Sequence, residues 1–142
     1  MTISHLGGLS AEQFLAVYWQ KKPLLIRGAF APFRDFVTHT SLRELAARDD
    51  VLSRLVVERD GEWSVTQGPL RAGDYRGLKR AHWSLLVQGI DQLLPQGKAL
   101  LQHFNFIPHA RLDDLMISFA PRGGGVGPHF DSYDVFLLQG QG

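Results

Sequence analysis

Three short apolar runs, separated by breaks that contain Pro, Gly and Asp, give the last third of this sequence the character of a β-sheet. The runs are residues 99–107 (ALLQHFNFI), 115–119 (LMISF) and 133–138 (YDVFLL). Runs of this length that are bounded by turn residues are typical of β-strands. The sequence therefore predicts a β-rich region that begins near residue 99.

The N-terminal part has a mixed pattern. Capping boxes, in which a serine is followed three residues later by Gln or Glu, predict helices that begin after Ser10 and after Ser41. We expect these helices over residues 11–20 and 42–48. A short apolar run at 24–26 fits a buried strand better than a helix, because it is too short for helical turns.

A hairpin and a long helix are predicted between these elements and residue 99. Apolar residues alternate on either side of the Asp60-Gly61 turn pair, which predicts a β-hairpin over residues 54–67. Apolar residues then recur at helical spacing over 83–94, so a helix is expected there, ended by Pro95. The three tryptophans, Trp19, Trp63 and Trp83, all fall in apolar patterns and are expected to pack in the core.

Size and composition favour one α+β chain. The sequence has 142 residues, of which 44% are hydrophobic and 20% charged, enough for about one domain with an ordinary core. We expect an N-terminal α/β part over residues 1–98, and the start of a second domain over 99–142. The formal net charge of +1 gives no general attraction to nucleic acid or to anionic membranes.

The absence of cysteine excludes disulfides, thiolate metal sites and cysteine nucleophiles. The first residues have neither a basic nor an apolar leader segment, so a cytoplasmic location is expected. A loose basic cluster, formed by Arg71, Arg76, Lys79, Arg80 and His82, is better explained as a solvated surface than as an RNA contact.

The segment from Arg122 to Asp131, RGGGVGPHFD, carries the chemistry. In an extended backbone the side chains of His129 and Asp131 project from the same face, so both can bind one ion. A histidine nitrogen and a carboxylate oxygen supply two of the three groups in the facial triad that holds non-haem Fe(II). The simpler alternative is an H-x-D that arose by chance and forms a surface pair or a loop-closing hydrogen bond.

The run LMISFAPRGGGVGPHFDSYDVFLLQGQG (115–142), together with WQKKPLLIRGAF (19–30), resembles the JmjC-type, cupin-like 2-oxoglutarate oxygenases that hydroxylate ribosomal proteins. Within that family it is most similar to the bacterial arginine hydroxylases of a large-subunit protein. The resemblance implies N-terminal helices and strands that lead into an incomplete double-stranded β-helix.

The resemblance also implies roles for single residues. His129 and Asp131 correspond to the first two Fe(II) ligands, and Ser118 corresponds to a residue that contacts 2-oxoglutarate. The family's third ligand, a later histidine, has no counterpart, because 11 residues follow Asp131. The basic residue that grips the far carboxylate of 2-oxoglutarate is expected after QGQG and is absent too. The sequence therefore resembles the N-terminal portion of a family member.

Two further residues are candidates for binding a substrate. Asp114, beside Asp113 and Arg111, can recognise a cationic side chain, although a solvated turn is the simpler and favoured reading. Tyr133 follows the candidate ligands and can line a cleft or the rim of the core. The other histidines fall near predicted ends or loops, where exposure to solvent is expected.

The leading hypothesis is a dioxygenase that hydroxylates arginine in a ribosomal protein with Fe(II) and 2-oxoglutarate, the intact family member being a homodimer. Related members hydroxylate histidine, which is the second choice of target. With two protein ligands we expect this chain alone to be inactive, so a non-catalytic fragment or binding-only remnant is the main alternative. A cupin-fold isomerase or sugar-binding protein is a third, although such proteins carry more histidines near the first pair.

Overall fold

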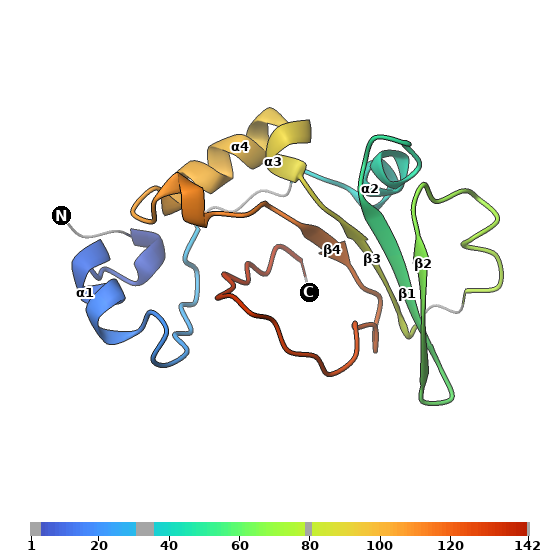
Figure 1. The fold of residues 1–142 in the computed structure, drawn as a ribbon. Coiled ribbons are helices and arrows are strands. Elements are labelled where there is room, and N and C mark those ends of the chain that lie inside the picture. The colour runs from blue at the N-terminus through green and yellow to red at the C-terminus, as the bar shows by residue number, and fades with distance from the viewer. Residues whose placement is uncertain (1–3, 31–35, 79–80, 142) are drawn as a thin grey trace. The chain divides into compact units, whose positions relative to one another are not determined.

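The computed structural model describes residues 4–30, 36–78 and 81–141, and these form an α+β fold, as expected. Figure 1 shows the helices and strands of the chain, which divides into two compact units. The larger unit is Phe36–His129, and the smaller combines Met1–Asp35 with Phe130–Gly142. Strands from both sides of the predicted boundary at residue 98 pair with one another inside the larger unit. The division into domains 1–98 and 99–142 stays a prediction.

The larger unit is built on a four-stranded antiparallel sheet in the order β2-β1-β3-β4. Its strands are β1 (Ser53–Arg59), β2 (Glu62–Gln67), β3 (Trp83–Val87) and β4 (Ile117–Phe119). The predicted hairpin is confirmed as β1 and β2. Its turn residues, Asp60 and Gly61, have φ angles of 55° and 87°, and two positive φ angles suit the twist of a tight hairpin.

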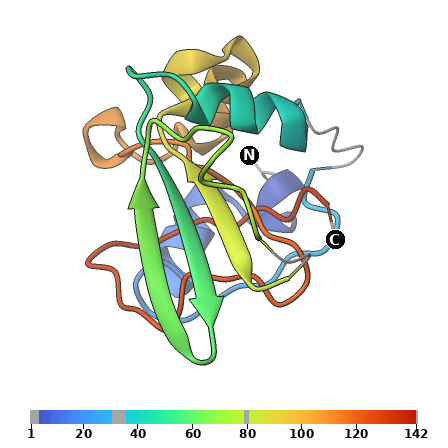
Figure 2. The same ribbon diagram turned by 90° about the vertical axis from the view of Figure 1, so that its right-hand side faces the viewer.

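One face of this sheet buries the hydrophobic core. Leu55, Leu85 and Phe119 lie opposite one another on β1, β3 and β4, and the first two are almost completely buried. Helix α2 (His39–Ala46), the teal helix in Figure 2, contributes Leu42 and Ala46 to the same cluster. The side chain of Ser53 donates a hydrogen bond to the Ala46 carbonyl at 3.2 Å, which places α2 on this face. The alternate residues, among them Arg54, Val56, Leu86 and Ser118, lie on the second face.

The helix expected over 83–94 is wrong. Its first half is strand β3, a central strand between β1 and β4 whose five residues are all buried. A strand buried on both faces loses the alternation that distinguishes it from a helix. Gly89, with a φ of 69°, ends the extended segment, and only α3 (Ile90–Leu93) is helical.

The strand expected over 99–107 is also wrong. Residues Pro95–Leu101 form helix α4, which is followed by the short 3-10 helix η2 (Gln102–Phe104). Pro95 does not end a helix here but occupies the first turn of the next one, where its missing N–H costs nothing. Gly97 is buried, and a Cβ there would lie 2.5 Å from the Ile90 carbonyl oxygen, so a glycine lets α4 pack against α3.

The remaining segments of the larger unit agree more closely with expectation. Helix α2 exists, but it begins at His39, because the capping box is formed by Thr38 and Ser41 rather than by the predicted pair that starts at Ser41. The run 115–119 contains strand β4. A 3-10 helix, η3 (His109–Arg111), precedes it. In the basic cluster, Lys79 and Arg80 lie outside the described residues.

The smaller unit joins the two ends of the sequence. It contains the 3-10 helix η1 (Ser4–Leu6) and helix α1 (Ala11–Val17), which has the predicted capping box of Ser10 and Gln13. The side chains of Phe14, Trp19 and Phe136 pack together, with ring centroids 5.6–6.0 Å apart.

Neither strand expected in this unit is present. Residues 24–26 and 133–138 are irregular, since no described segment of this unit pairs with them, and Leu25 and Leu137 are 77% and 92% exposed. The Nε2 of Gln20 donates a hydrogen bond to Asp134 at 3.0 Å, so side-chain contacts connect the two ends here.

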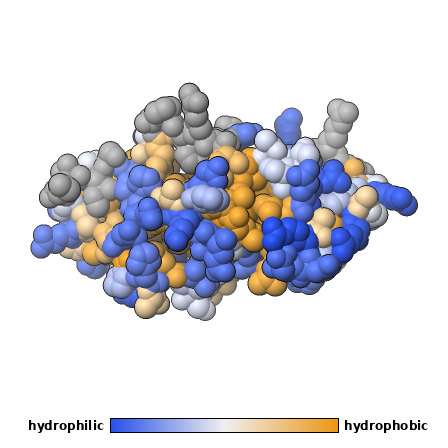
Figure 3. Space-filling model, turned by 90° about the horizontal axis from the view of Figure 1, so that it is seen from above, coloured by the Kyte–Doolittle hydropathy of each residue, from blue (hydrophilic) through white to orange (hydrophobic). Residues whose placement is uncertain are grey.

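Hydrophilic and hydrophobic residues are interspersed on the face seen in Figure 3. None of the helices in the described ranges has the length and apolar character needed to cross a bilayer.

His39 connects helix α2 to the sheet. Its ring stacks on Phe119 with centroids 4.2 Å apart and lies 6.0 Å from that of Trp83. Its Nε2 is buried and has no hydrogen-bond partner among the described residues. Burial lowers the pKa of His39 below its ordinary value of 6.5, and the nearby charge of Arg43 lowers it further.

We predict that this histidine makes the fold less stable in acid. Because the folded-state pKa of His39 is depressed, the unfolded chain binds the proton more readily, and stability is lost as pH falls below about 6.5. The unfolding free energy is measured with urea at about pH 7.5 and at about pH 5.5. Its decrease between these two pH values should be smaller in His39→Phe, which keeps the ring stack, than in the wild type. An equal loss in both proteins would contradict this role.

Candidate active site

The glycine-rich segment Arg122–Gly127, here called the glycine loop, passes very close to the end of β3. A Cβ at Gly124 would lie 2.2 Å from the carbonyl oxygen of Trp83, a distance that no side chain can occupy. The Arg122 carbonyl accepts a hydrogen bond from the His82 backbone N–H at 3.3 Å. Glycines in a loop can leave room for a ligand close to the backbone. In this loop, Gly124 makes room for the end of β3 instead.

A close contact between His82 and Glu58 supports the start of this loop. The Nδ1 of His82 lies 2.9 Å from the carboxylate of Glu58, whose other oxygen accepts a hydrogen bond from the Gly61 backbone at 2.6 Å. Gly123, with a φ of 73°, lies against the His82 ring, where a Cβ would be 3.1 Å from its Cε1. The hairpin turn, the His82–Glu58 contact and the loop are therefore mechanically connected.

Trp63 lies under the second half of the loop, and the expectation that it packs in the core is wrong. It is 42% exposed, because β2 is an edge strand and this residue projects from the second face. A Cβ at Gly127 would lie 3.3 Å from Cε2 of Trp63, and one at Gly125 would lie 3.8 Å from its Cη2. The loop thus lies over the face opposite the core.

His129 follows the loop and is held by it. Its Nδ1 lies 3.0 Å from the Gly127 carbonyl oxygen, at hydrogen-bond distance. Its side chain is exposed, as is that of Asp131, which belongs to the smaller unit. Within the described ranges of the chain, no group of three or more His, Asp or Glu side chains is placed to hold a metal ion. The chain therefore offers two donors of the types that non-haem Fe(II) binds, an imidazole and a carboxylate.

Ser118 lies on the second face of the sheet, the face that the glycine loop crosses. It is exposed on β4 and pairs with Leu86, which in turn pairs with Arg54. The Arg54 side chain reaches across this row, and its Nη2 lies 3.8 Å from the Met116 sulfur. The Nε of Arg54 is buried and has no hydrogen-bond partner among the described residues.

Arg54 is the site-face residue that we did not anticipate from the sequence. It brings a guanidinium group to the face that carries Ser118. Once the hairpin register is given, the alternation of β1 is the signal that could have placed Arg54 there, because its neighbours Ser53 and Leu55 face the core.

The two candidate substrate residues have different surroundings. The carboxylate of Asp114 accepts a hydrogen bond from the Gly89 backbone at 2.8 Å, and Asp91 accepts one from the Leu115 backbone at 2.9 Å. These bonds tie the start of α3 to the segment that leads into β4, so Asp114 has a structural task. Tyr133, in the smaller unit, is 64% exposed.

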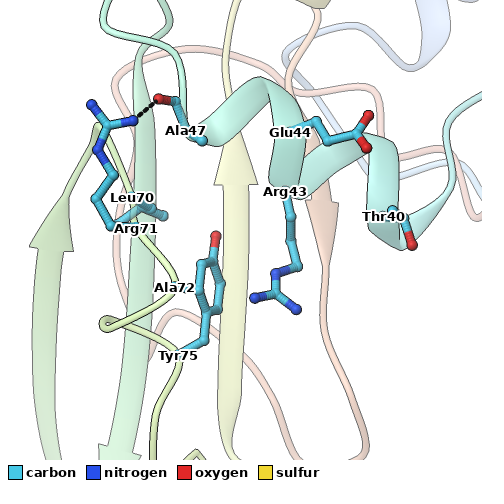
Figure 4. A pocket seen from close by; sticks show the side chains of 8 residues that line it. All are labelled: Thr40, Arg43, Glu44, Ala47, Leu70, Arg71, Ala72 and Tyr75. Atoms are coloured by element: carbon cyan, nitrogen blue, oxygen red, sulfur yellow. Dashed lines mark hydrogen bonds between the residues drawn. The ribbon is translucent and has the colours of Figure 1, made fainter.

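A cavity of about 350 Å³ lies on the side of the sheet that carries α2 (Figure 4). The guanidinium carbon of Arg43 lies 4.0 Å from the centre of the Tyr75 ring, and burial raises the pKa of Tyr75 above its ordinary value. The Arg71 side chain donates a hydrogen bond to the Ala47 carbonyl at 2.6 Å. None of the candidate site residues lines this cavity. Its lining residues are Thr40, Arg43, Glu44, Ala47, Leu70, Arg71, Ala72 and Tyr75.

Comparison with known proteins places the chain beside a group of oxygenases. The family model of the JmjC domain matches residues 99–142. The Escherichia coli ribosomal protein uL16 3-hydroxylase is 44% identical over 134 residues, which cover 94% of this chain and 35% of that protein. The chain thus spans about a third of the length of this relative.

Solved structures agree with the sequence comparison. The structure of YcfD, a ribosomal oxygenase from E. coli in complex with cobalt and succinic acid, matches with a TM-score of 0.81 and 42% identity. The match covers 87% of this chain and 34% of YcfD. A second YcfD structure, with cobalt and 2-oxoglutarate, matches with a TM-score of 0.80 over the same shares of the two chains. The expected resemblance in sequence and fold is therefore confirmed.

Substitution of the loop glycines tests the close approach to β3. Gly124→Ala should lower the unfolding free energy by about 1–3 kcal/mol, because the added methyl group collides with backbone that cannot yield. Gly125→Ala is the matched control, since its Cβ would meet only the Trp63 ring at 3.8 Å, and its effect should stay within about 0.5 kcal/mol. Chemical denaturation measures both, and equal effects would show that the loop is not held against β3.

Proposed function

Because the chain matches JmjC-type ribosomal oxygenases in sequence and fold over about a third of their length, we propose that it is part of an oxygenase dependent on Fe(II) and 2-oxoglutarate. Its proposed activity is hydroxylation of an arginine side chain in a large-subunit ribosomal protein. The observation that carries this proposal is the placement of His129. A loop anchored on the sheet presents this histidine, and the same segment falls in the JmjC match.

The donor chemistry of the chain fits an iron site. His129 would supply a nitrogen ligand and Asp131 a carboxylate ligand, and both groups suit non-haem Fe(II). The third ligand of a facial triad would come from outside the described residues, among which no cluster of three donors occurs. When bound, the iron and 2-oxoglutarate would supply the oxidising chemistry that places an oxygen atom on an unactivated carbon.

The residues of the chain have separate tasks in this proposal. The Gly127 carbonyl orients the His129 ring through its Nδ1, as groups around a metal site commonly do. The hydroxyl of Ser118 can donate a hydrogen bond to a carboxylate of 2-oxoglutarate from the second face of the sheet. Tyr133 is proposed to contact the substrate. We do not extend this role to Asp114, since its carboxylate already accepts a hydrogen bond from Gly89.

Several wider features accompany this proposal. Residues 99–142 are proposed to begin the catalytic domain, in line with the JmjC match over the same residues. A ribosomal protein substrate implies a cytoplasmic location, and the intact protein is proposed to be a homodimer. A histidine target is the alternative to arginine.

A binding-only remnant is the competing proposal for the chain itself. The observation in its favour is that the described residues bring no third metal donor to His129 and Asp131. Turnover by the protein that contains this chain separates the two proposals, because a remnant releases no succinate.

The activity is tested on the polypeptide purified from its natural source, with its mass measured first. Incubation with Fe(II), 2-oxoglutarate and ribosomes should release succinate and add one oxygen atom to an arginine of a large-subunit protein, as located by mass spectrometry. His129→Ala should reduce turnover to the level of a blank, because the iron loses a ligand. His109→Ala, which alters an exposed histidine in η3, should leave turnover intact.

Three results would count against the proposal. They are the absence of succinate release by the wild type, full turnover by His129→Ala, and equal losses in the two histidine variants. Oxygen found on a histidine would replace the proposed target while leaving the chemistry in place.

A further inference from the structure

Trp63 has a position that core packing does not explain. It lies on the edge strand β2, opposite Glu58 of β1, and is 42% exposed. All six residues of β2 are exposed, so this strand adds little to the core. A large aromatic side chain on such a strand can bury surface against a segment that crosses the second face of the sheet. Here that segment is the glycine loop.

The indole ring of Trp63 supports two glycines of the loop. Cβ positions built at Gly127 would lie 3.3 Å and 3.4 Å from Cε2 and Cδ2 of Trp63, and one at Gly125 would lie 3.8 Å from Cη2. Gly127 has a φ of 76°, which residues with side chains rarely adopt. The positive φ therefore favours glycine at residue 127, and the Trp63 ring leaves little room for a Cβ there. The backbone that carries the Gly127 carbonyl group thus lies directly against this ring.

The Gly127 carbonyl in turn fixes the proton on His129. A carbonyl oxygen can only accept a hydrogen bond, so the 3.0 Å contact with Nδ1 requires that nitrogen to carry the proton. In a neutral imidazole the lone pair is then on Nε2. Hydrogen bonds of this kind set the tautomer and ring direction of histidines that bind metals.

We propose that Trp63 is a positioning residue for His129, acting through the Gly127 carbonyl. The ring holds the backbone at residue 127, the carbonyl holds Nδ1–H, and Nε2 is presented for a metal ion. The step to the metal rests on the proposed function, whereas the step from Trp63 to the tautomer does not. A substitution one strand away from the ligand should therefore alter how His129 binds a metal.

The test uses the full 142-residue chain, labelled with ¹⁵N. Nitrogen chemical shifts report the tautomer of His129, and titration with Co²⁺ reports its metal affinity. In Trp63→Ala, His129 should become a mixture of tautomers, and Co²⁺ affinity should fall by about 10-fold, at the lower end of effects seen for groups around metal ligands. Trp63→Phe keeps an aromatic ring under the loop and should restore most of both properties.

Val65→Ala is the matched control. Val65 lies on the same face of β2, two residues along, and pairs with Val56. It should leave the tautomer and the Co²⁺ affinity unchanged, even though it removes apolar surface from the same strand. If both variants lose the same unfolding free energy and His129 changes only in Trp63→Ala, the loss of stability cannot explain that change.

Separate outcomes address the two proposals. A His129 tautomer that stays the same in Trp63→Ala would overturn the positioning role. So would a Co²⁺ affinity that falls equally in Val65→Ala. If wild-type His129 shows no response to Co²⁺ while Trp63→Ala still changes its tautomer, the proposed metal site is wrong and the orienting contact stands.

Discussion

The backbone of the glycine loop passes so close to the end of β3 that a side chain at residue 124 would collide with the carbonyl oxygen of Trp83. This close contact decides where the following residues can lie. It leads the chain over the second face of the sheet, onto the His82–Glu58 pair and the Trp63 ring, and then to His129. A loop with side chains at these positions would have to leave the sheet, and His129 would lose its support.

The sheet itself has two distinct faces. One face buries Leu55 and Leu85 under α2 and supplies the hydrophobic stabilisation of the larger unit. The second face carries Ser118, the Arg54 side chain that extends towards Met116, and the loop that leads to His129. The sheet and its core therefore act as a rigid platform, and the candidate site residues of the larger unit lie on the face opposite the core. Such separation suits a site whose geometry depends on a stable scaffold.

Local signals in the sequence were sufficient for some elements and insufficient for others. The Asp60-Gly61 turn and the Ser10 capping box act within a few residues, so the hairpin and α1 were predicted correctly. Strand β3 was mistaken for a helix because its burial on both faces, which removes the alternation of a strand, depends on segments that are distant in sequence. The segment 99–107 was mistaken for a strand because apolar composition alone does not show that Pro95 begins a helix.

The candidate site shows the same division. His129, Asp131 and Ser118 could be singled out from the motif and its family resemblance, because their spacing and type are local properties. The role of Trp63 could not, since it depends on an edge strand meeting a loop about 60 residues later. Arg54 was missed for a similar reason: its face is defined only by the sheet register.

The second face of the sheet and the loop that crosses it are proposed to form the metal-binding side of the larger unit. Titration of the labelled chain with Mn²⁺ tests this proposal directly, because this ion broadens NMR signals of nearby nuclei. The signals of Gly127, His129 and Asp131 should broaden first, that of Ser118 next, and those of α2 on the opposite face last. Broadening that begins at α2, or that spares His129 while affecting other histidines, would contradict it.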